Sequence, residues 1–501
     1  MPEIYRAFVF IMVMAIPTLL LARLATRSLV PPSEATLWRN CWLFTTCAVF
    51  LSGSFIVFVV LMIGLAIYVH KKTTAPIYLY IVLLVTAPVV GFTYGIPGVA
   101  QSVIELNPAR LLVLIFLLPT ALRIAHAPRP TSYRTVDTLV VAYMLLVAIL
   151  SLRHGAPTYT LRIALVVVVD FGVPYFVFSR CITSMEDIRK ALAAFVFCVL
   201  PFAAAGMFEI LRGWRTYNAV MEGWGVYLVQ AYLFRDGLLR AAVTAIEPIA
   251  FGYVCMVGLG LLLANKDAIR NKLFFWGTGA FITAGLMASL SRGPWLGTVF
   301  LFAVFAATTR RGVLNLAKLS TVVAILCVPL AFSPIGERIY RLLPFVGTVE
   351  KSNEEYRSKL IEVAVVIVGR NPLFGSHTYW EEPEMEQLIQ GQGIVDIVNS
   401  YVAIALEYGL VGLGLFASIF VLIGYSLFRA CFRTEGGEAV LLRAMTATLA
   451  AILLVIGTVS SVSIIPYVFW FVAGLSIAAL RVLEGSVRQQ LPKLTVLGYT
   501  R

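Results

Sequence analysis

The chain has 501 residues, of which 60% are hydrophobic and 13% are charged, and its mean hydropathy is +0.90. This composition excludes an ordinary soluble protein and is typical of a chain that crosses a membrane many times. The net charge is +13, but the basic residues are scattered over short loops, so membrane topology explains them better than nucleic-acid binding does. The seven cysteines show no CxxC spacing, so neither a disulfide framework nor a metal site is predicted.

About fourteen apolar runs are long enough, at roughly 17–25 residues, to cross a membrane. They lie at 6–22, 43–69, 76–94, 110–126, 135–152, 162–179, 189–211, 243–264, 273–290, 294–309, 316–334, 401–428, 443–461 and 465–481. No small-residue cleavage site follows the first run, so we expect a retained helix there. We therefore predict an all-α polytopic membrane protein with about 12–14 transmembrane helices. Eleven of these helices fall within 1–334, an extracytoplasmic loop follows at 335–400, and 401–501 holds three helices and a cytoplasmic tail.

The placement of lysine predicts the orientation, because cytoplasmic loops are enriched in Lys and Arg. With the N-terminus inside, every lysine except Lys351 and Lys359 falls on the cytoplasmic side. Arg23, Arg27 and Arg39 then lie outside, which works against this assignment of the first helix.

The long loop begins with a predicted helix over 352–370. Ser352 and Glu355 have the spacing of a capping box, and Asn371-Pro372 prevents the helix from continuing. The remainder, 375–401, is rich in Glu, Gln, Gly and aromatic residues. It either covers a cavity and offers groups that bind hydroxyls, or it is a solvated connection between two helices.

An arginine interrupts two apolar runs in the octet "LSRGPWLG", residues 290–297. Under the predicted topology both Arg292 and Arg240 face outward, each at the mouth of an apolar run. A guanidinium group binds phosphate through a bidentate fork, so the two arginines could clamp one diphosphate, which implies a lipid-linked substrate. The alternative is that each arginine reaches lipid headgroups or caps a helix end. Gly293 and Pro294 favour the first reading, because they enforce a tight break that fixes Arg292 in place.

Several other ionisable residues lie near the outer ends of apolar runs. Glu247 is expected to pair with one of the two arginines or to act as a base, and Asp396 and Glu407 flank the start of the twelfth run. His377 is the only histidine of the loop, and its ordinary pKa suits proton transfer near neutrality. We expect no cofactor, since there is no Walker motif, GxGxxG after a strand or HExxH.

Four motifs resemble the O-antigen ligase and O-antigen polymerase superfamily of bacterial envelope glycosyltransferases. They are "LLRAAVTAIEPIAFG" (238–252), "LSRGPWLG" (290–297), "RNPLFG" (370–375) and "VNSYVAIALEYGLVGLGLF" (398–416), in this order. The resemblance covers about residues 235–416. It implies a GT-C-like helical bundle that acts at the periplasmic face of the bacterial inner membrane.

The resemblance also implies an activity and a set of partners. A glycan would be transferred from an undecaprenyl diphosphate carrier to a glycan acceptor without metal or nucleotide, and Arg240 and Arg292 would bind the diphosphate. Membrane lipid surrounds such an enzyme, a chain-length regulator can accompany it, and nucleic acid is not a partner. We further expect a set of residues in or beside the long loop to contact the substrate: Arg357, Arg370, Asn399 and Tyr401.

One departure from the family pattern selects among the activities. Ligases commonly carry a histidine just before the asparagine, where this chain has Val398. We therefore expect a polymerase of exopolysaccharide, capsule or O-antigen repeat units, with a carboxylate or His377 as base. The alternatives are a ligase that moves finished glycan to lipid A core or protein and, in another class, a transporter or flippase of a lipid-linked or anionic solute.

Overall fold

The structure is a computed structural model that describes residues 2–96, 100–125, 132–227, 234–235, 237–331, 351–389 and 395–490. It is an all-α polytopic membrane protein with almost no sheet. Among the described residues, eight helices are long and apolar enough to cross a membrane, and three further apolar helices are shorter. Within these ranges, several of the predicted runs form shorter or broken helices, and individual breaks explain them.

The described elements follow in chain order. The first half contains α1 (Glu3–Thr26), α2 (Pro32–Leu51), α3 (Phe55–Lys72), α4 (Ile77–Leu83), β1 (Phe92–Ile96), β2 (Ala100–Leu106), α5 (Pro108–Leu112), η1 (Val113–Leu117), α6 (Leu118–Ile124), α7 (Arg134–Leu150), η2 (Ser151–His154), α8 (Pro157–Val167), η3 (Val168–Gly172), α9 (Val173–Cys181), α10 (Met185–Arg212), α11 (Asn218–Gly223), β3 (Phe234–Arg235), β4 (Leu238–Leu239) and η5 (Val243–Ala245). The second half contains α12 (Pro248–Ala264), α13 (Lys272–Ala288), α14 (Arg292–Ala307), α15 (Gly312–Ala331), α17 (Lys351–Arg370), η6 (Tyr379–Glu381), α18 (Pro383–Glu386), α19 (Ser400–Arg433), α20 (Gly436–Ile456) and α21 (Ile465–Gln490).

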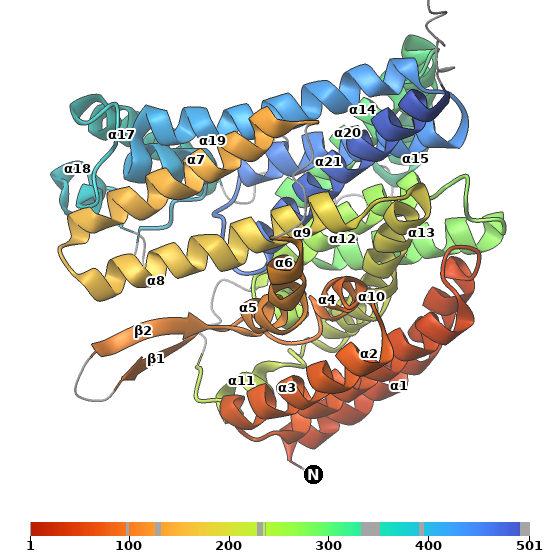
Figure 1. Cartoon of the computed structure of the whole chain (residues 1–501), viewed down its shortest axis with the longest axis horizontal. Coiled ribbons are helices and arrows are strands. Elements are labelled where there is room, and N and C mark those ends of the chain that lie inside the picture. Colours follow the sequence, from red (N-terminus) through yellow and green to blue (C-terminus); the bar gives the residue numbers. More distant parts are fainter. Residues whose placement is uncertain are drawn as a thin grey trace, which may run out of the picture.

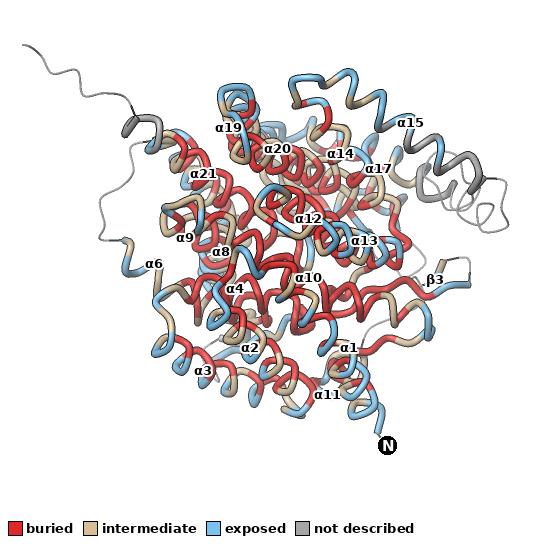
Figure 2. The backbone as a smooth tube through the Cα atoms, turned by 90° about the vertical axis from the view of Figure 1, so that its right-hand side faces the viewer, coloured by how far each residue is buried: buried red, intermediate tan, exposed pale blue. Residues whose placement is uncertain are grey.

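Two helices, α10 and α12, form the middle of the bundle. Both are apolar around nearly their whole circumference, and almost every residue of α12 is buried, as expected for a helix surrounded by other helices. Figure 2 shows this buried centre, with α1, α3 and α15 at the rim. In Figure 1 the α17–α18 region and the β1–β2 hairpin lie at one end of the bundle, and α13 and α15 reach toward the other. We call these the loop end, which also holds residues 212–227, and the lysine end, which holds residues 265–272.

The second apolar run, 43–69, forms parts of two helices and not one. Gly53 adopts φ +64°, and the Ser54 hydroxyl caps α3 by accepting the Val57 N–H at 3.4 Å, so the chain reverses between α2 and α3. The run was predicted as one helix because only three small residues, Ser52, Gly53 and Ser54, interrupt it.

This extra reversal changes the direction of α1. The Trp214 indole N–H donates to Glu3 Oε1 at 2.5 Å, and the Ser28 hydroxyl donates to the Ala268 carbonyl at 2.9 Å. The N-terminus therefore lies at the loop end, and the prediction that it shares a side with residues 265–272 is wrong. Arg27 and its neighbours in the α1–α2 turn move to the lysine end, which removes the objection that they raised against the topology.

The third apolar run, 76–94, is helical only over α4. Beyond it the chain is irregular but buried, and its backbone contacts a distant segment: the Val89 N–H donates to the Thr244 carbonyl at 3.1 Å, and the Thr244 hydroxyl donates to the Val85 carbonyl at 2.7 Å. Irregular backbone at this depth is tolerated where its polar groups are satisfied inside the protein.

The twelfth predicted span, 401–428, is not one straight helix. Gly409 (φ +68°, ψ −169°) separates a short helix, 400–408, from the long helix 410–433. The rings of Tyr401 and Phe416 have centroids 6.2 Å apart, whereas a straight helix would separate these residues by about 22 Å along its axis. The short helix therefore doubles back along the long one and carries its N-terminal end into the bundle.

The loop region packs as a unit over this bend. The helix predicted at 352–370 is present as α17, and it shares a small core with Tyr379, Met385 and Leu406. The Leu410 N–H donates to the Pro372 carbonyl at 2.8 Å, so "RNPLFG" closes directly onto the bend at Gly409. Residues 335–350 and 390–394 of the predicted loop lie outside the described residues.

Candidate functional site

Arg240 and Arg292 are brought to one place by two irregular segments at the loop end. The first, residues 240–247, we call the strap, and the second is the turn between α13 and α14. The Ala241 N–H donates to the Ala288 carbonyl at 3.0 Å, and Arg240 Nη2 donates to the Ser291 hydroxyl at 3.0 Å. Arg240 is only 9% exposed. It therefore contacts the residue immediately before Arg292, although 51 residues separate Arg240 from that serine.

The backbone around this pair is strained. Val243 (φ +50°), Ile246 (φ +68°) and Leu290 (φ +45°) all occupy the left-handed region, which costs about 1–2 kcal/mol for a residue with a Cβ. Outliers of this kind persist only when surrounding contacts impose them, and they cluster at functional sites.

A buried carboxylate imposes the strained conformation of the strap. Glu209 has no exposed surface; its Oε2 accepts the N–H groups of Ala242 and Val243 at 3.1 and 3.0 Å. Its Oε1 accepts both the N–H and the hydroxyl of Thr216 at 2.9 Å. The sequence prediction missed Glu209, although a lone carboxylate near the end of the run 189–211 was a readable signal.

Arg215 is a third arginine of the site and was also missed. It is 4% exposed, and its Nη2 donates to the Ile246 carbonyl of the strap at 2.9 Å. Its Nη1 is buried and has no hydrogen-bond partner among the described residues. A buried donor on a permanent cation is costly to leave unpaired, so this nitrogen suits an anionic oxygen.

The turn between α20 and α21, residues 457–463, connects the remaining parts of the site, and we call it the hydroxyl turn. Arg357 Nη2 donates to the Thr458 carbonyl at 3.1 Å, and a Cβ added to Gly293 would lie 2.9 Å from the Thr458 hydroxyl. The Ser463 hydroxyl donates to the Ala245 carbonyl of the strap at 2.8 Å. This turn was not predicted, although the hydroxyl-rich "TVSSVS" between two apolar runs could have indicated it.

Asp396 contacts the same turn. Its Oδ1 accepts from the Ser460 hydroxyl at 3.0 Å, and its backbone is held by Tyr356, whose hydroxyl donates to the Asp396 carbonyl at 2.9 Å. Glu247 is half-buried at the end of the strap and immediately precedes α12. The two predicted carboxylates thus belong to segments linked to the strap: Glu247 ends it, and Asp396 binds the hydroxyl turn, whose Ser463 donates to the Ala245 carbonyl.

Asn399 and Tyr401 form hydrogen bonds that hold the short helix 400–408 in place. Asn399 Oδ1 accepts the N–H groups of Tyr401 and Val402 at 2.9 and 3.2 Å, and the Tyr401 hydroxyl donates to the Leu453 carbonyl at 2.8 Å. These contacts fix the entry of the short helix into the bundle. Their predicted contact with the substrate stays a prediction.

His377 belongs to a second cluster, at the other end of the short helix. Its ring centroid lies 5.0 Å from that of His154, and His154 Nε2 lies 3.7 Å from Glu407 Oε1. Arg153 anchors this cluster by donating to the Glu407 carbonyl at 2.7 Å and to the Gly375 carbonyl at 3.0 Å.

The ion pairs of Arg370 are likewise with residues outside the hydroxyl turn. It forms ion pairs with Glu382 and Glu384 at the far end of α17. The hydrogen bond from Arg370 lowers the pKa of the Glu384 carboxyl, and the same contact raises the pKa of Arg370. Within the described ranges, no three His, Cys, Asp or Glu residues gather in a way that could hold a metal ion.

The fold and the site define a multi-pass, all-α membrane protein whose arginines, carboxylates and hydroxyls converge at one end of the bundle. Residues 277–417 match the family model described as O-antigen ligase, a range that includes Arg292, α17 and the short helix 400–408. This match supports the resemblance of the chain to the O-antigen ligase and polymerase superfamily. Among the curated proteins, a search finds no match to this chain.

Proposed function

We propose that the protein is an inner-membrane glycosyltransferase that polymerises undecaprenyl-diphosphate-linked oligosaccharide repeat units of exopolysaccharide, capsule or O-antigen at the periplasmic face. The observation that carries the proposal is the hydrogen bond from Arg240 to Ser291, next to Arg292. It sets two guanidinium-bearing segments side by side at the end of a membrane bundle. A glycan-processing activity of this general type agrees with the family match.

In the proposed mechanism the arginines act on the leaving group. Arg240 and Arg292 hold the donor diphosphate, and they neutralise the charge that develops as the bond from the anomeric carbon to the diphosphate oxygen breaks. A hydroxyl of the acceptor sugar attacks that carbon from the opposite face and inverts its configuration. One well-placed donor in such a site contributes about 3–4 kcal/mol, or roughly 10²–10³ in kcat.

The proton of the attacking hydroxyl goes to a carboxylate in this mechanism. Asp396 is favoured, because the hydroxyl turn that binds it also contacts Arg357 and the strap. Glu247 is the second candidate, because it closes the strap that begins with Arg240. His377 is disfavoured, since its neighbours are His154 and the Glu407 cluster and not the hydroxyl turn.

The charge distribution supports a periplasmic site. With α1 reversed, the described lysines outside α17 lie toward the lysine end, and Lys351 and Lys359 lie on α17. By the positive-inside rule, this distribution supports a cytoplasmic lysine end and a periplasmic loop end.

The second candidate is an O-antigen ligase that transfers finished glycan to lipid A core or to protein. The description of the matching family favours it, whereas Val398, in place of the histidine that ligases commonly carry, favours the polymerase. Both enzymes would use the same arginine pair.

Complementation of a polymer-deficient strain tests the proposal. We expect Arg240→Ala and Arg292→Ala to leave single repeat units on the carrier at normal protein levels. Arg212→Ala, which changes an exposed arginine at the same end of the bundle, is the matched control and should restore polymer. Polymer that forms but stays unattached to its acceptor would identify a ligase. Full-length polymer in both arginine variants would refute the diphosphate clamp.

A further inference from the structure

An apolar cavity of about 210 Å³ lies between α7, α8, the bent helix α19 and α21. Aromatic and branched aliphatic side chains form most of its wall. They include Tyr143, Val167, Phe171, Ile404, Phe416 and Trp470. The cavity exists because the short helix 400–408 doubles back at Gly409, which leaves one face of that helix opposite α7 and α8.

Two hydroxyl groups interrupt this apolar wall, and they belong to the candidate site. Ser461 and Ser400 both line the cavity, and the Ser461 hydroxyl donates to the Ser400 hydroxyl at 2.6 Å. Ser461 is part of the hydroxyl turn that contacts Arg357 and Asp396. The cavity is therefore apolar in its body and polar where it meets the site. An occupant that matches both parts has a hydrocarbon chain and a polar head.

We propose that this cavity receives the first isoprene units of a polyprenyl chain whose diphosphate is held by Arg240 and Arg292. The inference rests on the proposed function and deepens it by assigning the place of the lipid. A cavity of about 150 Å³ is enough to bind a benzene molecule. A volume of about 210 Å³ thus takes roughly one or two five-carbon units, and the rest of the chain extends into the membrane.

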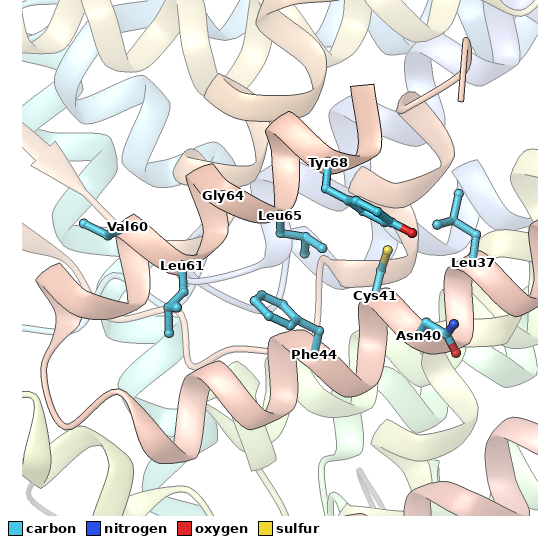
Figure 3. A pocket seen from close by; sticks show the side chains of 9 residues that line it. All are labelled: Leu37, Asn40, Cys41, Phe44, Val60, Leu61, Gly64, Leu65 and Tyr68. Atoms are coloured by element: carbon cyan, nitrogen blue, oxygen red, sulfur yellow. The ribbon is translucent and has the colours of Figure 1, made fainter. Parts of the chain in front are cut away.

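A larger groove between α2 and α3 is the rival location for the chain. Figure 3 shows Phe44 of α2 facing Leu61 and Leu65 of α3 across this groove, which has a volume of about 410 Å³. Its polar lining residues are Asn40 and Tyr68. The Tyr68 ring lies 5.9 Å from Lys72 Nζ, at the C-terminal end of α3 and away from the loop end. A lipid bound there would place its head at the opposite end of the bundle from the arginines.

Photolabelling of the full-length protein in lipid nanodiscs tests the assignment. The probe is a polyprenyl diphosphate that carries a diazirine on its first isoprene units, and labelled peptides are identified by mass spectrometry. We expect label on α7, the 400–408 helix and α21. Ile404→Trp should fill the cavity and reduce labelling at least about tenfold, because burial of the chain in the cavity is lost.

Matched variants separate this effect from misfolding. Val421→Trp adds the same side chain to the long helix 410–433 of α19, at a position that is 63% exposed, and it should label like the wild type. Ala403→Leu, a smaller change in the cavity wall, should give an intermediate loss. Label on α2 and α3, or labelling that Ile404→Trp leaves unchanged in a folded protein, would overturn the assignment.

A separate assay of glycan transfer distinguishes the two proposals. A protein that forms polymer but is labelled elsewhere would refute the cavity assignment alone. A protein that is labelled in the cavity but forms no glycosidic bond with any lipid-linked donor would refute the proposed function and leave the lipid site in place.

Discussion

The Glu209 carboxylate accepts the backbone N–H of Val243 at 3.0 Å, and Val243 holds a left-handed conformation that a β-branched residue rarely adopts. The carboxylate and the strained strap are therefore coupled. Without the Glu209 carboxylate as acceptor, the strap loses the hydrogen bonds that stabilise its strained conformation. Since Arg240 begins the strap, the position of its guanidinium depends on a side chain at the end of α10.

Glu209→Gln tests this coupling. The amide oxygen can replace only one carboxylate oxygen as acceptor, so charge-assisted hydrogen bonds worth about 1.5–3 kcal/mol are weakened. We expect the KM for the lipid-linked donor to rise about tenfold or more, with a modest fall in Tm. Glu222→Gln, at an exposed carboxylate on α11, is the control. An unchanged KM with the same fall in Tm would mean that Glu209 only stabilises the fold.

Arg215→Gln tests whether the third arginine serves the donor. The variant can retain a donor to the Ile246 carbonyl but removes the charge and the unpaired Nη1. If that nitrogen binds phosphate oxygen, the KM for the donor rises about tenfold while kcat changes less, because a charge-assisted hydrogen bond is lost on binding. Arg212→Gln should behave as the wild type. A donor KM that does not move would remove Arg215 from the site.

The contact between "RNPLFG" and the α19 bend depends on two glycines. A Cβ on Gly409 would lie 2.4 Å from the Leu373 backbone, and one on Gly375 would lie 2.4 Å from the Leu406 carbonyl oxygen. Both residues also have positive φ. We expect Gly409→Ala and Gly375→Ala each to lower stability by at least about 1–2 kcal/mol from backbone strain alone, measured by thermal unfolding in detergent. Gly414→Ala, where nothing lies within 4 Å, should be neutral or slightly stabilising.

The α17–α18 region should loosen in acid. The hydrogen bond from Arg370 lowers the pKa of Glu384 in the folded protein. A carboxyl with a lowered pKa stabilises the fold above its unfolded value, about 4.3, and that stabilisation is lost as pH falls through the lower folded value. Protection factors from hydrogen exchange in α17 and α18 should therefore fall below about pH 4.3. Glu384→Gln should abolish this dependence, and Glu386→Gln, at an exposed carboxylate, should leave it intact.

Cysteine accessibility tests the direction of α1. We expect Ser28→Cys, in the turn beside Ala268, to react with an impermeant thiol reagent only from the cytoplasmic side. Glu222→Cys, on α11 at the loop end, should react only from the periplasmic side. Reaction of both positions from one side would contradict the reversed first helix.

The sequence indicated the arginine pair because a cation beside apolar runs is conspicuous and has few roles. A lone carboxylate in an apolar run also marked Glu209, but its role could not be predicted, because it accepts backbone N–H groups of a segment 33 residues away. The same holds for the hydroxyl turn: its composition is visible in the sequence, but its contacts with the strap and with Arg357 depend on the tertiary structure.

Backbone reversals were the second source of error. Gly53 and Gly409 each split an apolar run that reads as continuous. At Gly409 the cause is tertiary, because the bend is bonded to residues 372 and 373 of another segment. The class of fold follows from composition and run length, whereas the number and direction of crossings depend on such contacts.

The bend at Gly409 bears on which parts of the protein can vary independently. The described residues of 351–389 and 395–408 share a small core of their own, and their contacts with the bundle include Arg357 to Thr458 and Leu410 to Pro372. The outer surface of this unit is free to vary without disturbing the strap or its arginines. If the proposed function holds, differences in sugar recognition can be confined to this outer unit while the arginine-bearing strap stays the same.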